Sequence, residues 1–170
     1  MVGRACLILF CLLWHLRVEA ETAYAQLSSF ATQMPEPGGF SLAKMEAVDL
    51  IKEIDVSEKK DAIVIRKNGL YLLSFSGQLG SMVKGTEGYM DVWFVKNGKP
   101  IVNSNNRMYL SRLIPVTLLT TTALSELSPG DTLSIAYSAS GPEIGLLYLP
   151  ADKGPPIVST IFSAFMVNGD

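Results

Sequence analysis

Short runs rich in β-branched and aromatic residues follow one another along the chain after residue 62. Within the run 70–79, Tyr71, Leu73 and Phe75 lie at every second position, and this period of two predicts a strand with one buried face. Other runs of high β-propensity lie at 63–65, 89–96, 101–102, 116–124, 132–137, 144–149 and 157–167. This series of short strands with closely spaced turns predicts a β-sandwich or a barrel.

Residues that favour turns separate these runs. Lys67-Asn68-Gly69 predicts a tight hairpin before the strand 70–79, and Asn97-Gly98 predicts a second one of type I′. Ser128-Pro129-Gly130-Asp131 predicts a turn, because proline fixes φ and glycine tolerates a positive φ. Polar loops are predicted at 34–39, 84–88, 103–107 and 151–156.

The segment 40–55 fits two kinds of structure. Apolar residues such as Met45 and Val48 fall at helical spacing, whereas Ile54 and Val56 also fit a strand and its return. We favour strand and loop, because an all-β domain seldom contains a lone helix within its sheet.

The N-terminal segment has the pattern of a targeting signal. Ala5–Trp14 is a compact apolar run that follows Arg4 and ends before His15. It is about half as long as the roughly 20 apolar residues that span a bilayer, so we predict a secreted protein without a stable membrane span. A short signal anchor is the alternative.

Small residues after this run mark a cleavage site. Val18 and Ala20 fit positions −3 and −1, which predicts a signal peptide at residues 1–20 and a single domain at 21–170. Cleavage after Ala25 is the alternative, but it would leave an unusually long polar stretch after the apolar run.

Cleavage after residue 20 would change the chemistry of the chain. Both cysteines, Cys6 and Cys11, and the only histidine, His15, lie in the predicted signal peptide. The mature domain would then contain no disulfide, no structural zinc site of the usual kind, no thiol nucleophile and no Ser-His-Asp triad. We therefore predict a protein that is not an enzyme and has no resident cofactor. The net charge of −2 offers no basic surface for nucleic acid.

Several local motifs occur in an order that resembles one family. Residues 67–71 (KNGLY) followed by Phe75 are similar to its "G-x-Y-x-x-x-F/Y" strand, and 127–131 (LSPGD) to its "L-x-x-G-D" turn. Residues 160–167 (TIFSAFMV) are similar to its last strand, and 93–101 (WFVKNGKPI) to the hairpin of its bacterial and phage members. The sequence thus resembles the globular head of complement component 1q, in the tumour necrosis factor-like superfamily.

This resemblance implies an all-β, antiparallel jelly-roll β-sandwich that forms a homotrimer. The inner sheet of each subunit would pack on its neighbours around a threefold axis. The aromatic candidates for that interface are Tyr71, Phe75, Tyr137, Phe162 and Phe165. Each of them also fits the core of a single subunit, because aromatic residues bury large areas in both settings.

A polar loop offers a candidate surface for a ligand. Asn103, Asn105, Asn106 and Arg107 form a predicted loop tip with many hydrogen-bond donors. Binding residues are frequent on loops that a rigid scaffold positions, although ordinary hydrophilic turns have the same composition. The expected partners are extracellular proteins or glycans.

One acidic motif resembles a catalytic strand. Glu53, Asp55 and Glu58 match the E-x-D-x-x-E pattern of laminarinase-type glycoside hydrolases, which use two carboxyl groups about 5–5.5 Å apart. Lys59 and Lys60 follow immediately, so a solvated turn is the interpretation that we favour.

Calcium is the one cofactor that remains open. Secreted modules often bind it through several oxygen ligands, and Asp91, Asp131 or Asp152 could contribute. No EF-hand spacing is present in the sequence.

Together these patterns predict a secreted, non-enzymatic recognition module that acts as a homotrimer and binds its ligand through loops or subunit grooves. The first alternative is a structural module at a surface or fibre tip, whose function is trimerisation itself. The second is a glycoside hydrolase that uses Glu53, Asp55 and Glu58.

Overall fold

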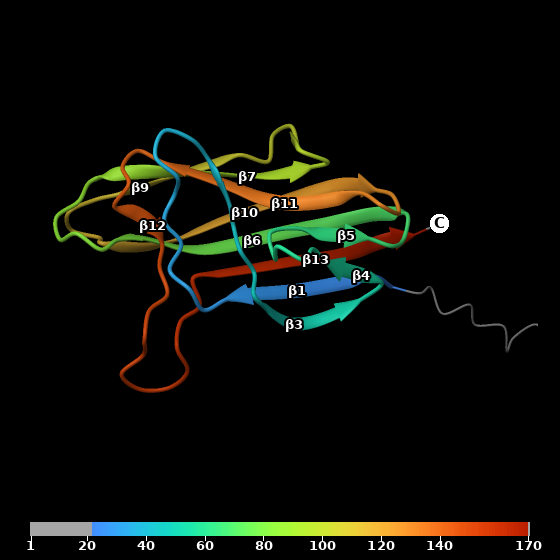
Figure 1. Cartoon of the computed structure of the whole chain (residues 1–170), viewed down its shortest axis with the longest axis horizontal. Helices are drawn as coiled ribbons and strands as arrows, with labels where there is room; N and C mark the ends of the chain where they lie inside the picture. The colour runs from blue at the N-terminus through green and yellow to red at the C-terminus, as the bar shows by residue number, and fades with distance from the viewer. Residues whose placement is uncertain (1–21, 170) are drawn as a thin grey trace, which may run out of the picture.

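The computed structural model describes residues 22–169, which form two antiparallel sheets packed face to face (Figure 1). The strands are β1 (Tyr24–Ser29), β2 (Ser41–Leu42), β3 (Ala47–Lys52), β4 (Ile54–Val56), β5 (Ile63–Ile65), β6 (Gly69–Ser81), β7 (Gly88–Lys96), β8 (Lys99–Pro100), β9 (Asn106–Leu110), β10 (Val116–Leu127), β11 (Thr132–Ala139), β12 (Ile144–Leu146) and β13 (Thr160–Gly169).

The two sheets draw on strands from all parts of the chain. Sheet A has the order β10-β6-β13-β1-β3, and β12 pairs with β6. Sheet B has the order β4-β5-β11-β7-β8, with β2 on β11 and β9 on β7. The predicted all-β jelly-roll sandwich is thereby confirmed. No helix forms within residues 22–169, so the segment 40–55 is strand and loop, as favoured.

The core lies between the two sheets. In β6, Tyr71, Leu73 and Phe75 are fully buried, which confirms the period of two. Phe162 of β13 packs from the same sheet against Phe94 of sheet B, with 6.2 Å between ring centroids. A buried aromatic side chain covers a large apolar area, so this layer supplies much of the hydrophobic stabilisation.

Two predicted turns form as expected. Asn97 and Gly98 have φ values of 50° and 75°, and both positive values are what a type I′ hairpin between β7 and β8 requires. Gly130 has a φ of 89°, and the Asp131 N–H donates to the Ser128 carbonyl oxygen at 3.0 Å. This second turn carries the chain from sheet A to sheet B.

The predicted hairpin at Lys67-Asn68-Gly69 is wrong. β5 pairs with β4 and β11 in sheet B, whereas β6 pairs with β10 and β13 in sheet A. The residues between β5 and β6 therefore connect the two sheets. Gly69 serves close approach rather than a turn, since a Cβ there would lie 2.5 Å from the Asn168 carbonyl oxygen.

The predicted strand 101–102 and the loop that follows it are misplaced. β8 ends at Pro100, and β9 begins at Asn106 because this stretch pairs with β7. The loop between them is fixed by buried Ser104. Its hydroxyl donates to the Ile101 carbonyl oxygen at 2.8 Å and accepts from the Phe94 N–H at 3.1 Å.

The sandwich has two distinct ends. β1 begins and β13 ends at one of them, beside the mark for the C-terminus (Figure 1). Val116 pairs with Gly80, so the β6–β7 and β9–β10 loops lie together at the opposite end.

The predicted signal peptide lies outside the described residues. Close to it in the chain, Ala23 and Ala25 are buried at the start of β1, and Ala23 accepts a hydrogen bond from the Met166 N–H at 2.9 Å. Among residues 22–169, no helix has the length and hydropathy that crossing a bilayer would require.

Candidate functional site

An apolar row crosses four strands on the outer face of sheet A. Leu124 pairs with Leu72, Leu72 with Phe165, and Phe165 with Tyr24. Directly paired residues of antiparallel strands point to the same face, so these four side chains, which we call the apolar row, are contiguous. Leu72, Leu124 and Phe165 are 43%, 59% and 49% exposed. The row thus leaves a continuous apolar strip open to solvent.

More apolar side chains lie on the same face, beyond a polar strip. Ser74 and Ser163 pair with each other next to the row, and Ile161 and Leu118 follow further along the strands. Ile161 and Leu118 are 39% and 53% exposed. Contiguous exposed apolar surface of this kind marks interaction sites on soluble proteins.

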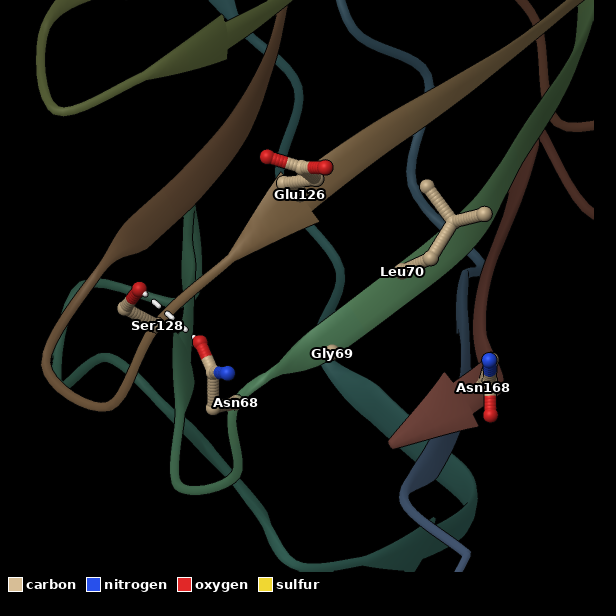
Figure 2. Close-up of a pocket in the computed structure, with 6 residues that line it drawn as sticks. All are labelled: Asn68, Gly69, Leu70, Glu126, Ser128 and Asn168. Carbon is tan, nitrogen blue, oxygen red and sulfur yellow. Dashed lines mark hydrogen bonds between the residues drawn. The ribbon is translucent and has the colours of Figure 1, made fainter. Parts of the chain in front are cut away.

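A polar recess of about 410 Å³ lies alongside the apolar row (Figure 2). It is lined by Asn68, Gly69, Leu70, Glu126, Ser128 and Asn168. Glu126 pairs with Leu70 and Leu70 with Asn168, in the cross-strand row beside the apolar one. The recess therefore belongs to the same face of sheet A.

The side chains of this recess favour hydrogen bonding rather than covalent chemistry. In Figure 2, Ser128 and Asn68 lie close together, and the Ser128 hydroxyl donates to the Asn68 side-chain oxygen at 3.2 Å. The Glu126 carboxylate extends from the neighbouring strand β10. Amide, hydroxyl and carboxylate groups can together bind hydroxyl-rich or amide-bearing ligands.

The five aromatic candidates divide between the core and the surface. Tyr71, Phe75, Tyr137 and Phe162 are buried within the single chain, which is the alternative that the sequence left open, whereas Phe165 is exposed. Burial raises the pKa values of Tyr71 and Tyr137. A side chain without exposed surface offers a neighbouring subunit nothing to contact. If these strands contact a neighbouring subunit, they must do so through the outward-facing residues that alternate with the buried ones.

The alternation of side chains explains this division. Phe162 and Phe165 are three positions apart in β13, so they point to opposite faces of sheet A. Leu72, Leu124 and Tyr24 join Phe165 on the outer face, and none of them is among the five aromatic candidates. The alternation in β6 could have indicated this, because Leu72 lies between buried Tyr71 and Leu73 and must therefore point outward.

The predicted ligand loop is split between a loop and a strand. Asn103 and Asn105 are exposed on either side of buried Ser104. Asn106 and Arg107 belong to β9, and the Asn106 side chain donates to the Thr120 carbonyl oxygen at 2.9 Å. Thus two of the four exposed residues lie in the loop and two at the start of β9, and ligand binding by them stays a prediction.

Arg107 is held by its neighbours on sheet B. Its Nε and one terminal nitrogen donate to the two carboxylate oxygens of Asp91, both at 2.7 Å, and its guanidinium lies 3.8 Å from the centroid of the Tyr89 ring. The Asp91 carboxylate raises the pKa of Arg107 above its ordinary range. Paired in this way, Arg107 orders the surface around Tyr89.

Comparison with known proteins supports the architecture. No protein-family model matches the sequence, and no curated protein matches it. Among solved structures, the globular domain of a zebrafish complement 1qA protein superposes with a TM-score of 0.60 at 13% identity, over 88% of this chain and 100% of that chain. The fold is that of the complement 1q globular domain.

In this complement 1q-like fold, the three acidic residues of the hydrolase pattern are not arranged along one strand. Glu53 has a φ of 55° at the turn between β3 and β4, and Glu58 follows β4. Asp55 lies in β4 and forms an ion pair with Arg66. The face-sharing of Glu53 and Asp55 that the motif requires is therefore absent.

Two of the three aspartates considered as calcium ligands form ion pairs with basic side chains in the complement 1q-like domain. Asp91 pairs with Arg107, and Asp131 with Lys96 at 2.9 Å. Asp152 is exposed in the β12–β13 loop. Within the described part of the chain, His, Cys, Asp and Glu do not gather in groups of three that could hold a metal ion. Calcium binding stays a prediction without a located site.

Proposed function

We propose that this protein is a secreted, non-enzymatic recognition module that forms a homotrimer through the outer face of sheet A. Its ligand is an extracellular protein or glycan, bound at loops or in grooves between subunits. The observation that carries the proposal is the apolar row, which crosses four strands in register and stays exposed in the single chain.

Burial of this row gives a physical reason to associate. Removing apolar surface from water contributes about 25 cal/mol per Å², and Ile161 and Leu118 add exposed apolar surface on the same face beyond the polar strip. In a closed ring of three, each subunit contacts its two neighbours through two different patches, and both patches would lie on this face. The complement 1q-like fold agrees with a general role in recognition.

The recess supports binding near the interface. Because Glu126, Leu70 and Asn168 lie in the cross-strand row next to Leu124 and Leu72, a neighbouring subunit on the apolar row would deepen the recess. A polar groove beside an apolar contact is a common setting for ligand recognition.

Secretion rests on the predicted signal peptide at residues 1–20. The burial of Ala23 and Ala25 favours cleavage after Ala20 over cleavage after Ala25, since the later cut would remove the first two of the six residues of β1, which pairs with both β13 and β3.

The test is sedimentation of the chain that begins at residue 21. We expect a trimer at micromolar concentration and a monomer for Phe165→Asp, which places a charge in the middle of the apolar row. Val102→Asp is the matched control, because Val102 is 83% exposed in the β8–β9 loop and is not part of the apolar row. A parent chain that stays monomeric would contradict the trimer.

A Glu53→Gln variant examines the non-enzymatic part. We expect neither the parent nor the variant to hydrolyse β-glucans, because Glu53 lies in a turn and Asp55 is paired with Arg66. Cleavage by the parent that the variant loses would establish a hydrolase instead.

A further inference from the structure

Two tight turns at the end of the sandwich away from the chain termini carry exposed apolar side chains. Met82 and Val83, in the β6–β7 loop, are 74% and 57% exposed; Leu113 and Ile114, in the β9–β10 loop, are 93% and 57% exposed. We call these four side chains the apical tip. The pairing of β6 with β10 places both loops side by side (Figure 1).

Each turn bonds its own polar groups. The Ile114 N–H donates to the carbonyl oxygen of Ser111 at 3.1 Å. The Thr86 hydroxyl donates to the Val83 carbonyl oxygen at 2.8 Å and accepts from the Ser81 hydroxyl at 3.0 Å. These bonds give the turns a defined shape, so the apolar side chains project at little further cost in conformational entropy.

Amphipathic side chains lie next to the apical tip. Tyr109, which precedes the β9–β10 loop, is 67% exposed, and its ring centroid is 6.0 Å from that of Tyr89. Arg112 forms an ion pair across the two loops with Glu87 at 3.3 Å, and Lys84 is exposed. Tyrosine and long cationic side chains with one apolar and one polar end are typical of the boundary between lipid and water.

We propose that the apical tip inserts into the boundary between headgroups and acyl chains of a lipid bilayer. A stable protein interface needs about 800 Å² of complementary surface on each partner. The apical tip is instead a set of four side chains on two projecting turns, a shape around which lipid can deform. Binding by such a tip depends mainly on the apolar area that it buries.

Because most cations at this end are paired with carboxylates, burial of apolar side chains rather than attraction to anionic lipid should drive the insertion. Arg112 is paired with Glu87, and Arg107 with Asp91, so among these three cations of the described chain only Lys84 is without an ion pair to a carboxylate. Phosphatidylcholine should therefore suffice, and phosphatidylserine should add little.

The strength of binding rests on the proposed homotrimer. Threefold symmetry places three copies of the apical tip in one plane, and an axis along the strands of sheet A points them in one direction. Linking weak sites in this way raises the overall affinity by about 10²–10⁴-fold.

Flotation with phosphatidylcholine vesicles tests the insertion, with and without phosphatidylserine. We expect the parent chain to float with both, and Leu113→Asp and Met82→Asp each to bind at least about tenfold more weakly, since a carboxylate replaces an inserted apolar group. Val102→Asp, equally apolar in the parent but far from the tip, should float like the parent. A Leu113→Asp variant that floats like the parent would overturn the proposal, as would flotation only with phosphatidylserine that salt abolishes.

A fluorescent variant separates this proposal from the trimer. Leu113→Trp should show a blue shift on addition of phosphatidylcholine vesicles, whereas Val102→Trp should not, whatever the oligomeric state. A monomer in sedimentation with a blue shift for Leu113→Trp would remove the trimer and keep the insertion. A trimer in sedimentation whose Leu113→Trp variant shows no blue shift would keep the trimer and overturn the insertion.

Discussion

The outer faces of the two sheets carry similar apolar side chains but differ in how much of that apolar surface the rest of the chain covers. On sheet B, Trp93 and Ala136 are paired neighbours, and Phe40 packs across Trp93 with 5.7 Å between ring centroids. Ala136 has no exposed surface. On sheet A, Leu72 and Phe165 are also paired neighbours, yet both remain more than two-fifths exposed.

The difference lies in the connection before β2. Residues 30–40 cross from β1 in sheet A to β2 in sheet B, and Phe40 comes with them. No comparable segment covers the apolar row within the described residues, as the exposure of its leucines and of Phe165 shows. One apolar face is therefore partly covered by the subunit itself, whereas the other stays exposed in the single chain.

The largest effect should separate the two faces of β13. Phe162→Ala removes a fully buried ring that packs against Phe94, and should lower the free energy of unfolding by about 3–5 kcal/mol. Phe165→Ala should lower it by less than about 1 kcal/mol when the protein is dilute, because that ring is half exposed. Urea unfolding measures both.

The concentration dependence of the same experiment is the control. The unfolding midpoint of the parent should rise with protein concentration, as mass action requires of an oligomer, and that of Phe165→Ala should not. Equal losses for the two variants in dilute protein would mean that the faces of β13 are wrongly assigned.

The sequence was sufficient for the core of β6, because its period of two leaves one choice of buried face. The sequence was misleading where the same local residues can form either of two structures. Asn68-Gly69 has the chemistry of a hairpin, but the chain changes sheets there. Asn106 and Arg107 have loop chemistry, but pairing with β7 makes them a strand.

The candidate surfaces were less predictable, because exposure depends on what the rest of the chain covers. Phe40 and Phe165 are both aromatic residues on strands or at their ends, and only the fold shows that the first covers Trp93 while the second is uncovered. The apical tip was missed for a related reason. Its apolar residues lie in turns, where the pattern of a strand or helix gives no expectation of their position.

The next largest effect concerns the first strand. A chain that begins at Gln26 lacks Tyr24 and Ala25, which pair with both β13 and β3, and Ala23, whose carbonyl oxygen accepts from the Met166 N–H. We expect the free energy of unfolding to fall by roughly 2–3 kcal/mol relative to a chain that begins at residue 21, through lost backbone hydrogen bonds and buried alanines. Urea unfolding of the two chains measures it.

The same pair of chains examines where the signal peptide ends. A shorter chain of unchanged stability would remove the structural argument against cleavage after Ala25. Mass spectrometry of the secreted protein would then identify the site directly.

A smaller effect comes from the turn that joins the sheets. Burial raises the pKa of Asp131, but hydrogen bonds from Lys96, the Ser128 N–H and Asn97 outweigh it and hold the pKa below its ordinary value. A lowered pKa in the folded state stabilises the protein above about pH 4, and this contribution is lost as the pH falls through the folded value. Asp131→Asn should therefore lower the free energy of unfolding by about 1–2 kcal/mol at pH 7 and weaken its decline below pH 4.

Asp152→Asn is the control for this pH dependence, since Asp152 is exposed in a loop. Unfolding followed between pH 2 and pH 7 should leave the control parallel to the parent. An Asp131→Asn profile that is also parallel to the parent would exclude the turn as a source of acid sensitivity.

The smallest effect is expected from uncovering the outer face of sheet B, so that it becomes exposed like that of sheet A. Phe40→Ala uncovers Trp93, and because Phe40 is already 57% exposed, the free energy of unfolding should fall by only about 1 kcal/mol. Trp93 fluorescence should shift to longer wavelength as water reaches the indole. Phe30→Ala is the matched control: Phe30 is 53% exposed and contacts Tyr148 instead, so it should leave the emission unchanged. If Phe40→Ala left the emission of Trp93 at the parent's wavelength, the cover would come from elsewhere, and the contrast between a closed and an open face would lose its structural cause.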